Sequence, residues 1–222
     1  MRFAIRALGL VFGLLMAVSA SAGVVVETTS NIGAGFRIGG SIRQVELMTW
    51  TQSTTYTDVA ISALVGSLSG SNELFEAYLT TAVGPGATAA DVVASTVKTA
   101  PAKASVFDFT SVSLFTGLSL APGTYYLVLY NSDTNPASLI RWARGNSTTL
   151  GAGVSGLGGA FANNGTGLVV PATPYQSTFV ISTLNDFAFS VTGTAVPEPS
   201  TFASALLALI GVGAARRLRR RV

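Results

Sequence analysis

The chain has 222 residues, 49% of them hydrophobic, and its 13 Lys and Arg residues against 10 Asp and Glu residues give a formal net charge of +3. Seven of the basic residues and one acidic residue lie in the first 22 and last 27 residues, so residues 23–195 have a net charge of −3 and no basic stripe for nucleic acid. The absence of Cys and His excludes disulfides, His-dependent triads, zinc sites with N or S ligands, His-ligated haem and Fe–S clusters, and we expect no cofactor.

The first 22 residues have the pattern of a secretory signal peptide. Two arginines precede an apolar stretch at residues 7–18, which at 12 residues is too short to span a membrane. Ala20 and Ala22 then form a small-x-small cleavage site. We predict that signal peptidase cleaves before Gly23 and that the protein is exported.

Residues 23–195 are predicted to form one domain built from strands. Hydrophobic and polar residues alternate in short segments, and turn-forming Gly, Pro and Asn residues separate these segments. Strands are predicted at residues 42–51, 58–65, 73–80, 105–110, 113–118, 124–130, 139–143, 178–183 and 187–192. Only residues 88–97 could form a helix, with Thr88 and Asp91 as a capping box. The pattern predicts an all-β fold, an antiparallel β-sandwich or jelly-roll.

Two stretches of this domain carry a family resemblance. Residues 77–86 (AYLTTAVGPG) and 118–129 (LSLAPGTYYLVL) each combine a strand pattern with a Gly-Pro or Pro-Gly turn. In this they resemble the choice-of-anchor β domains of anchored bacterial surface proteins. The resemblance implies an architecture and no activity.

A glycine-rich stretch matches the residue spacing of a nucleotide-binding motif but lacks the strand and helix pattern around it. Residues 151–156 (GAGVSG) match GxGxxG, which cradles a dinucleotide phosphate when it joins a strand to a helix. Here the glycines continue to residue 167 without a βαβ pattern. We therefore predict a flexible loop at residues 151–167.

Acidic and amide side chains leave two further possibilities open. A glycosidase needs two carboxylates about 5 to 9.5 Å apart. The candidate carboxylates are scattered along the chain, at Asp58, Glu73, Glu76, Asp108 and Asp186. Residues 131–135 (NSDTN) cluster oxygen donors that could hold calcium, although a capped turn needs the same residues. We expect no metal site and no catalysis, with a secreted carboxylate-dependent glycan-degrading enzyme as the alternative.

Aromatic residues suggest a place where a sugar ring could bind. Aromatic faces suit the apolar faces of pyranoses, while flanking polar groups fix the orientation of the sugar. Arg141 and Arg144 flank Trp142, and the other candidates are Trp50 and the tyrosines at 125, 126 and 130. Burial in the core is the competing interpretation, and exposure of Trp142 would favour binding.

The last 27 residues combine three elements in a fixed order. The short motif Val196-Pro197-Glu198-Pro199-Ser200 comes first, and its two prolines keep it extended. An apolar run follows at residues 201–215, and at about 1.5 Å per residue this helix would span only about 22 Å of a core of about 30 Å. The basic end consists of Arg216, Arg217, Arg219, Arg220 and Arg221.

This tail resembles the PEP-CTERM sorting signal of exported bacterial proteins. The resemblance implies that exosortase, an enzyme of the inner membrane, recognises the motif and removes the tail. It also implies a final place at the cell surface or in an extracellular matrix, where exopolysaccharide would be a partner.

The sequence thus predicts a signal peptide (1–22), a β-sandwich (23–195) and a sorting signal (196–222). We expect a non-catalytic surface or matrix protein that binds carbohydrate or associates with exopolysaccharide. A self-associating structural or adhesive protein is the remaining alternative, which long unprotected edge strands would favour.

Overall fold

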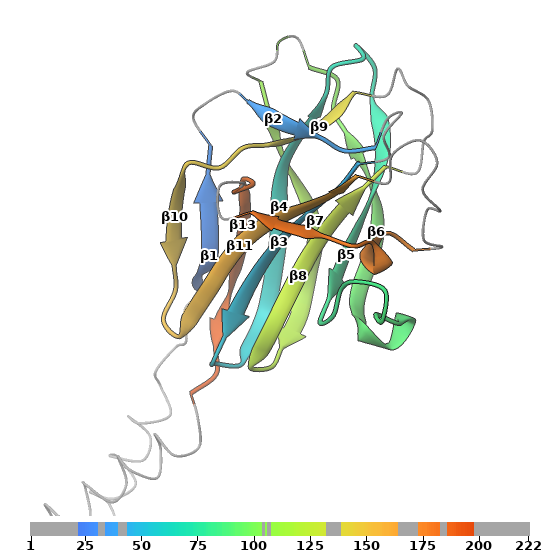
Figure 1. The fold of residues 1–222 in the computed structure, drawn as a ribbon. Helices are drawn as coiled ribbons and strands as arrows, with labels where there is room; N and C mark the ends of the chain where they lie inside the picture. Colours follow the sequence, from blue (N-terminus) through green and yellow to red (C-terminus); the bar gives the residue numbers. More distant parts are fainter. Residues whose placement is uncertain are drawn as a thin grey trace, which may run out of the picture.

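The computed structural model describes residues 22–30, 34–39, 44–103, 105, 108–131, 139–163, 173–182 and 186–197 (Figure 1). These residues form strands and two 3₁₀ turns, with no α-helix among them. The strands are β1 (Gly23–Thr29), β2 (Gly35–Arg37), β3 (Gln44–Gln52), β4 (Tyr56–Ser67), β5 (Glu73–Thr80), β6 (Val92–Ala100), β7 (Thr110–Leu120), β8 (Gly123–Tyr130), β9 (Ile140–Ala143), β10 (Ser147–Leu150), β11 (Val154–Asn163), β12 (Val180–Ser182) and β13 (Phe189–Ala195); the 3₁₀ turns are η1 (Ala89–Asp91) and η2 (Pro174–Gln176).

The strands form two antiparallel sheets in a sandwich-like arrangement, which confirms the predicted fold class. The six-stranded sheet has the order β12-β11-β3-β8-β5-β6. In the seven-stranded sheet β4 is the central strand: β7 pairs along one edge, while β13 and β9 pair with successive parts of the other edge. Beyond them, β1 and β10 continue from β13, and β2 continues from β9.

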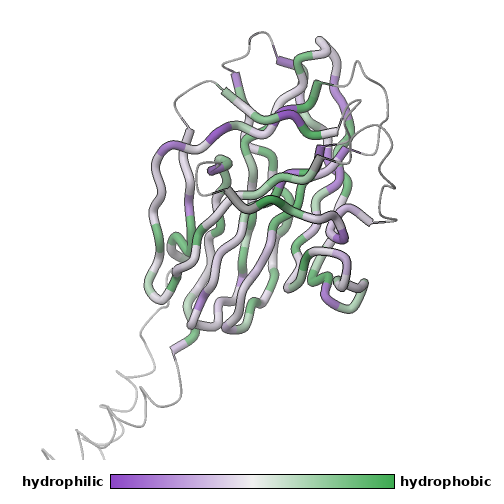
Figure 2. The backbone as a smooth tube through the Cα atoms, in the orientation of Figure 1, coloured by the Kyte–Doolittle hydropathy of each residue, from purple (hydrophilic) through white to green (hydrophobic). Residues whose placement is uncertain are grey.

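The main core lies between the two sheets. Hydrophobic and hydrophilic residues alternate along most of the strands (Figure 2), so these strands present an apolar side to the other sheet. The inward side of β4 supplies Val59, Ile61, Ala63 and Val65, and the facing sheet supplies Trp50 and Phe75 among others. A second, smaller cluster covers the outer face of the six-stranded sheet, where Tyr175 of η2 packs on residues of β3, β8 and β11.

Residues 88–97, the one stretch that we considered a possible helix, do not form one. The capping pair is present, because the Asp91 carboxylate accepts hydrogen bonds from both the backbone N–H and the hydroxyl of Thr88, but the helical turn ends at Asp91. Residues 92–100 form β6 instead and pair with β5, with a β-bulge at Val93. β-branched side chains favour a strand, and sheet pairing outweighs a cap that stabilises a single turn.

Two other predicted segments differ from the structure. The glycine-rich loop is wrong over residues 154–163, which form β11 between β3 and β12 after a turn at Gly151–Gly153. The strand predicted at residues 105–110 is also wrong for the described residues, since β7 begins only at Thr110. Phe109 instead lies over the sheet face beside Gly35, which has no side chain to obstruct it.

Candidate functional site

Both ends of the folded domain lie at one end of the sandwich. Gly23, where β1 begins, pairs its strand with Gly193 of β13, and β13 ends two residues later. The N–H of Val196 donates to the carbonyl of Thr55 (2.9 Å), which ties the start of the predicted sorting motif to the same end. We call this the proximal end. Both predicted processing sites therefore adjoin it, and β1 begins at the residue predicted to become the N-terminus.

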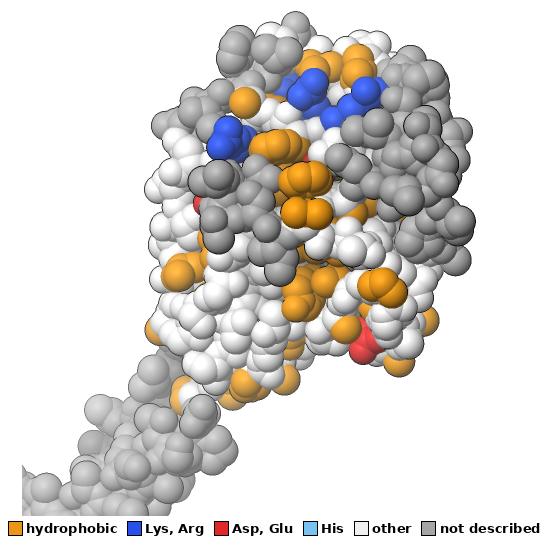
Figure 3. Space-filling view, in the orientation of Figure 1, with side chains coloured by type: hydrophobic (Ala, Val, Ile, Leu, Met, Phe, Trp, Pro, Cys, Tyr) orange, Lys and Arg blue, Asp and Glu red, His pale blue; other side chains and the backbone are white. Residues whose placement is uncertain are grey.

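The opposite end of the sandwich carries a group of arginines. β4 runs from Tyr56 at the proximal end to Ser67, which pairs with Ile140 of β9 at what we call the distal end. Arg37 of β2 and Arg141 of β9 lie directly opposite each other there, and Lys and Arg side chains gather at this end in Figure 3. The two arginines place two positive charges side by side at this end of the sheet.

Backbone and ring contacts hold the arginines in place. The Nη1 of Arg141 donates to the carbonyl of Gly35 at 2.7 Å. The guanidinium carbon of Arg144 lies 5.9 Å from the centre of the Phe36 ring. The backbone of Arg144, just after β9, forms an isolated β-bridge with Phe187. We define Arg37, Arg141 and Arg144 as the distal arginines.

The proposed stacking role of Trp142 is wrong. Trp142 has no exposed surface, and its ring stacks on Phe187 at a centroid distance of 4.8 Å. The indole Nε1 donates to the carbonyl of Ala188 (2.8 Å), so both the ring and the polar atom are satisfied within the core. Because side chains alternate along β9, Trp142 faces the core while Arg141 faces the other way.

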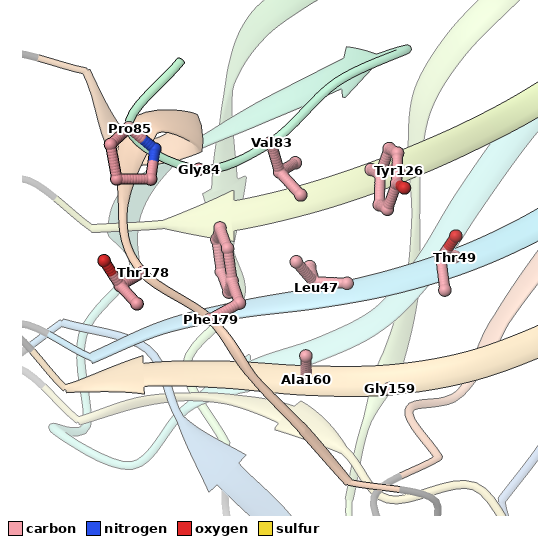
Figure 4. A pocket seen from close by; sticks show the side chains of 10 residues that line it. All are labelled: Leu47, Thr49, Val83, Gly84, Pro85, Tyr126, Gly159, Ala160, Thr178 and Phe179. Carbon is pink, nitrogen blue, oxygen red and sulfur yellow. The ribbon is translucent and has the colours of Figure 1, made fainter. Parts of the chain in front are cut away.

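The remaining aromatic candidates do not form a platform. Trp50, Tyr125 and Tyr130 are buried. Tyr126 alone is half-buried and lines a pocket on the outer face of the six-stranded sheet (Figure 4). The pocket has a volume of about 260 Å³ and is lined by Leu47, Thr49, Val83, Gly84, Pro85, Tyr126, Gly159, Ala160, Thr178 and Phe179. None of these residues is charged, so the pocket offers no catalytic carboxylate.

Lys103 lies beside the distal arginines on the outer face of the seven-stranded sheet. Its alkyl chain packs on Gly66, and its Nζ sits 3.0 Å from the centre of the Phe109 ring. Burial lowers the pKa of Lys103 to about 8, with a further lowering by Arg141 and an opposing effect of Asp108. This lysine is therefore a structural part of the distal end.

Two of the five carboxylates considered for catalysis, Glu73 and Glu76, form hydrogen bonds within the fold. Glu73 accepts hydrogen bonds from the Ser67 hydroxyl (2.5 Å) and from the N–H of Leu139 (3.2 Å). Glu76 accepts one from the Tyr78 hydroxyl at 2.6 Å, which contributes with burial to raising the pKa of that tyrosine. Among the described residues no three acidic side chains come close enough to hold a metal ion.

Glu46 is a buried carboxylate that the sequence analysis did not single out. It lies on β3 between Leu129 and Phe161 and has no exposed surface. Neither carboxylate oxygen accepts a well-formed hydrogen bond among the described residues, although the Gln44 side chain lies near enough to favour the charged form. Burial raises the pKa of Glu46 to about 9, and the side chain of Gln44 opposes only part of this shift. In the sequence, the signal for this buried carboxylate was the position of Glu46 between the hydrophobic residues Val45 and Leu47 of a predicted strand.

Several predicted features fall outside the described residues. Of the possible calcium-binding stretch, only Asn131 is described, and it is buried. Ala20 of the cleavage site, the sorting motif from Glu198 onward, the predicted apolar helix and the terminal arginines lie outside as well. Within the described part, no helix is long and apolar enough to cross a membrane.

Comparison with known families bears on the tail. Residues 195–221 match the PEP-CTERM protein-sorting motif. The chain is thus an exported protein that exosortase sorts and that is anchored in the membrane before processing. No curated protein matches the chain. The PEP-CTERM match begins at the last residue of β13, so the signal starts where the folded domain ends.

Proposed function

We propose that this PEP-CTERM protein is a non-catalytic surface or matrix protein whose β-sandwich binds acidic exopolysaccharide. The observation that carries the proposal is the sorting motif at residues 195–221, directly after a domain whose two ends lie together. This arrangement attaches the domain by its proximal end and leaves the distal end pointing away from the attachment point. Signal peptidase and exosortase are the two processing partners.

The distal arginines are the best candidates for contacting the polysaccharide. A guanidinium binds a carboxylate through two parallel hydrogen bonds, and uronic acids present such groups at regular intervals. Arg37 and Arg141 lie opposite each other across the β2–β9 pair, so one carboxylate could contact both guanidinium groups. Their position at the free end of an attached domain suits contact with a surrounding matrix.

The glycan-degrading alternative gains less support. The pocket of Figure 4 has no acidic residue in its lining, and Glu73 and Glu76 serve hydrogen bonds within the fold.

Replacing one residue of the motif tests the sorting step. With Glu198→Ala, we expect unchanged export but accumulation of the full-length precursor in the inner membrane, because exosortase no longer removes the tail. Glu27→Ala, an acidic replacement in β1 outside the matched residues, serves as the control and should be processed normally. Intact mass and membrane fractionation report the outcome. Identical mass and fractionation of the Glu198→Ala and unaltered proteins, in a strain that makes exosortase, would contradict the proposal.

A further inference from the structure

The two long edge strands of the sandwich lie on the same side. β6 ends the six-stranded sheet with nine residues, and β7, with eleven residues, ends the seven-stranded sheet next to it (Figure 1). The other edge strands are short: β12 and β2 have three residues each, and β10 has four. Short edges resist pairing with other chains, whereas long regular edges invite it.

β6 carries few of the features that protect an edge strand, and its one irregularity is a β-bulge at Val93, near its first residue. It contains no proline, and Lys98 is its only charged residue. Among the described residues its partner is β5 alone, so the opposite edge is open. Val93 and Val97 are 40% and 59% exposed on the outward side of β6, and Leu74 of β5, near Val97, is 64% exposed. We call these three residues the apolar strip; Ser95 of β6 lies between its two valines, and Glu76 of β5 lies directly opposite Val97.

The order of residues in β6 is self-complementary in one antiparallel register. If two copies pair around a two-fold axis at Ser95, Val93 of each copy lies opposite Val97 of the other, which forms two apolar cross-strand pairs. Lys98 then lies opposite Val92, so the two lysines stay apart. An axis at Thr96 would instead place Val97 opposite Ser95 and break both pairs.

We propose that β6 pairs with β6 of a second copy of this chain, antiparallel and centred on Ser95. The pairing joins two six-stranded sheets into one continuous sheet and brings the uncharged β7 strands of the two copies close to the same junction. The partner is a second copy of this chain because the apolar strip is self-complementary, so the same strip supplies both halves of the contact.

The geometry also limits where the pairing can form. An antiparallel contact reverses the direction of the second sandwich, so the two proximal ends point in opposite directions. Copies anchored in one membrane cannot meet in this way, whereas released copies, or copies on two facing surfaces, can. This last step rests on the proposed attachment by the tail, and the pairing itself does not.

A cysteine substitution tests the register directly, because the chain has no cysteine of its own. In the exported protein made from the full chain, Ser95→Cys should give a disulfide-linked dimer, since residues directly opposite are about 4.5 to 5.5 Å apart at Cα, within disulfide range. Thr99→Cys is the matched control: it is also exposed on β6, but its symmetry mate lies about 26 Å away. We expect about tenfold more linked dimer from Ser95→Cys under mild oxidation.

A second variant tests the apolar strip without a covalent bond. Val97→Lys should leave the monomer folded, because the side chain is already exposed, and should reduce dimer formation at a given concentration at least about tenfold. Sedimentation of the unaltered protein should show a concentration-dependent dimer. Equal linking of Ser95→Cys and Thr99→Cys, or a monomer at every concentration tested, overturns the pairing. Neither result bears on processing at Glu198, so the two proposals fail separately.

Discussion

Arg141 and Trp142 are neighbours in β9, yet the sheet sends their side chains to opposite faces. Trp142 is sealed in the core against Phe187, while Arg141 faces Arg37 on the outer side. Adjacent letters suggested one combined sugar site, but successive residues of a strand cannot share a face. The arginine part of the predicted site therefore remains a candidate, and the aromatic part does not.

Glu46 makes the stability of the protein depend on pH. Its pKa is about 9 in the folded protein and about 4.5 when unfolded, so the folded state binds more protons between these values and stability falls as pH rises through them. Glu46→Gln keeps the shape without the charge. At pH 7 we expect it to raise the free energy of unfolding by on the order of 3 kcal/mol, and at pH 4 to change it little.

Urea unfolding at pH 4, 7 and 9 measures this effect. The difference between Glu46→Gln and the unaltered protein should grow from pH 4 to pH 9. A difference that stays constant would show that the carboxyl does not change its charge on unfolding over this range, and would refute the assigned pKa.

At the scale of elements, the segment that follows β6 packs against the seven-stranded sheet at Gly66, which has no side chain. Pro101 and Lys103 exchange backbone hydrogen bonds with Ser67, and the Lys103 chain crosses Gly66 so closely that a Cβ there would lie 2.1 Å from its Cδ. Gly66→Ala should therefore push Lys103 away and lower the free energy of unfolding by about 1 to 3 kcal/mol.

Gly86→Ala is the control for this prediction, because a Cβ at Gly86 meets nothing within 4 Å. It should change the free energy of unfolding by no more than about 0.5 kcal/mol. Thermal or urea unfolding of both variants gives the comparison. If Gly66→Ala proves as mild as Gly86→Ala, the docked position of Lys103 is not important for stability.

The sequence alone predicted the strands that a local residue pattern determines. It missed the strands that depend on pairing with another strand. Strands β4, β5 and β8 follow from alternation and from the turns between them, and the structure confirms them. β6 was considered a possible helix because its cap is visible in the sequence, whereas its pairing with β5 is not. β11 was expected as a loop because its glycines indicate flexibility, and only the hydrogen bonds to β3 and β12 make it a strand.

At the scale of the molecule, the sandwich has a chemical polarity. The proximal end carries both junctions to the processed segments, and the distal end carries Arg37, Arg141, Arg144 and Lys103. Residues 23–195 have a net charge of −3, so this basic end stands out against an acidic domain. A charged ligand in the matrix would therefore approach the end that faces away from the attachment point.

Removing one distal charge tests this polarity. Arg37→Gln should weaken binding to polygalacturonic acid about 5- to 10-fold, because one charge-assisted, two-point contact is lost, and should make binding less dependent on salt. Lys98→Gln removes the same charge from β6 and should have little effect. Affinity is measured by titration at two salt concentrations, with neutral dextran as the uncharged ligand. This comparison distinguishes charge recognition from non-specific binding. Equal losses for Arg37→Gln and Lys98→Gln, or equal binding of dextran and polygalacturonic acid, would show that the distal arginines do not recognise the acidic polysaccharide.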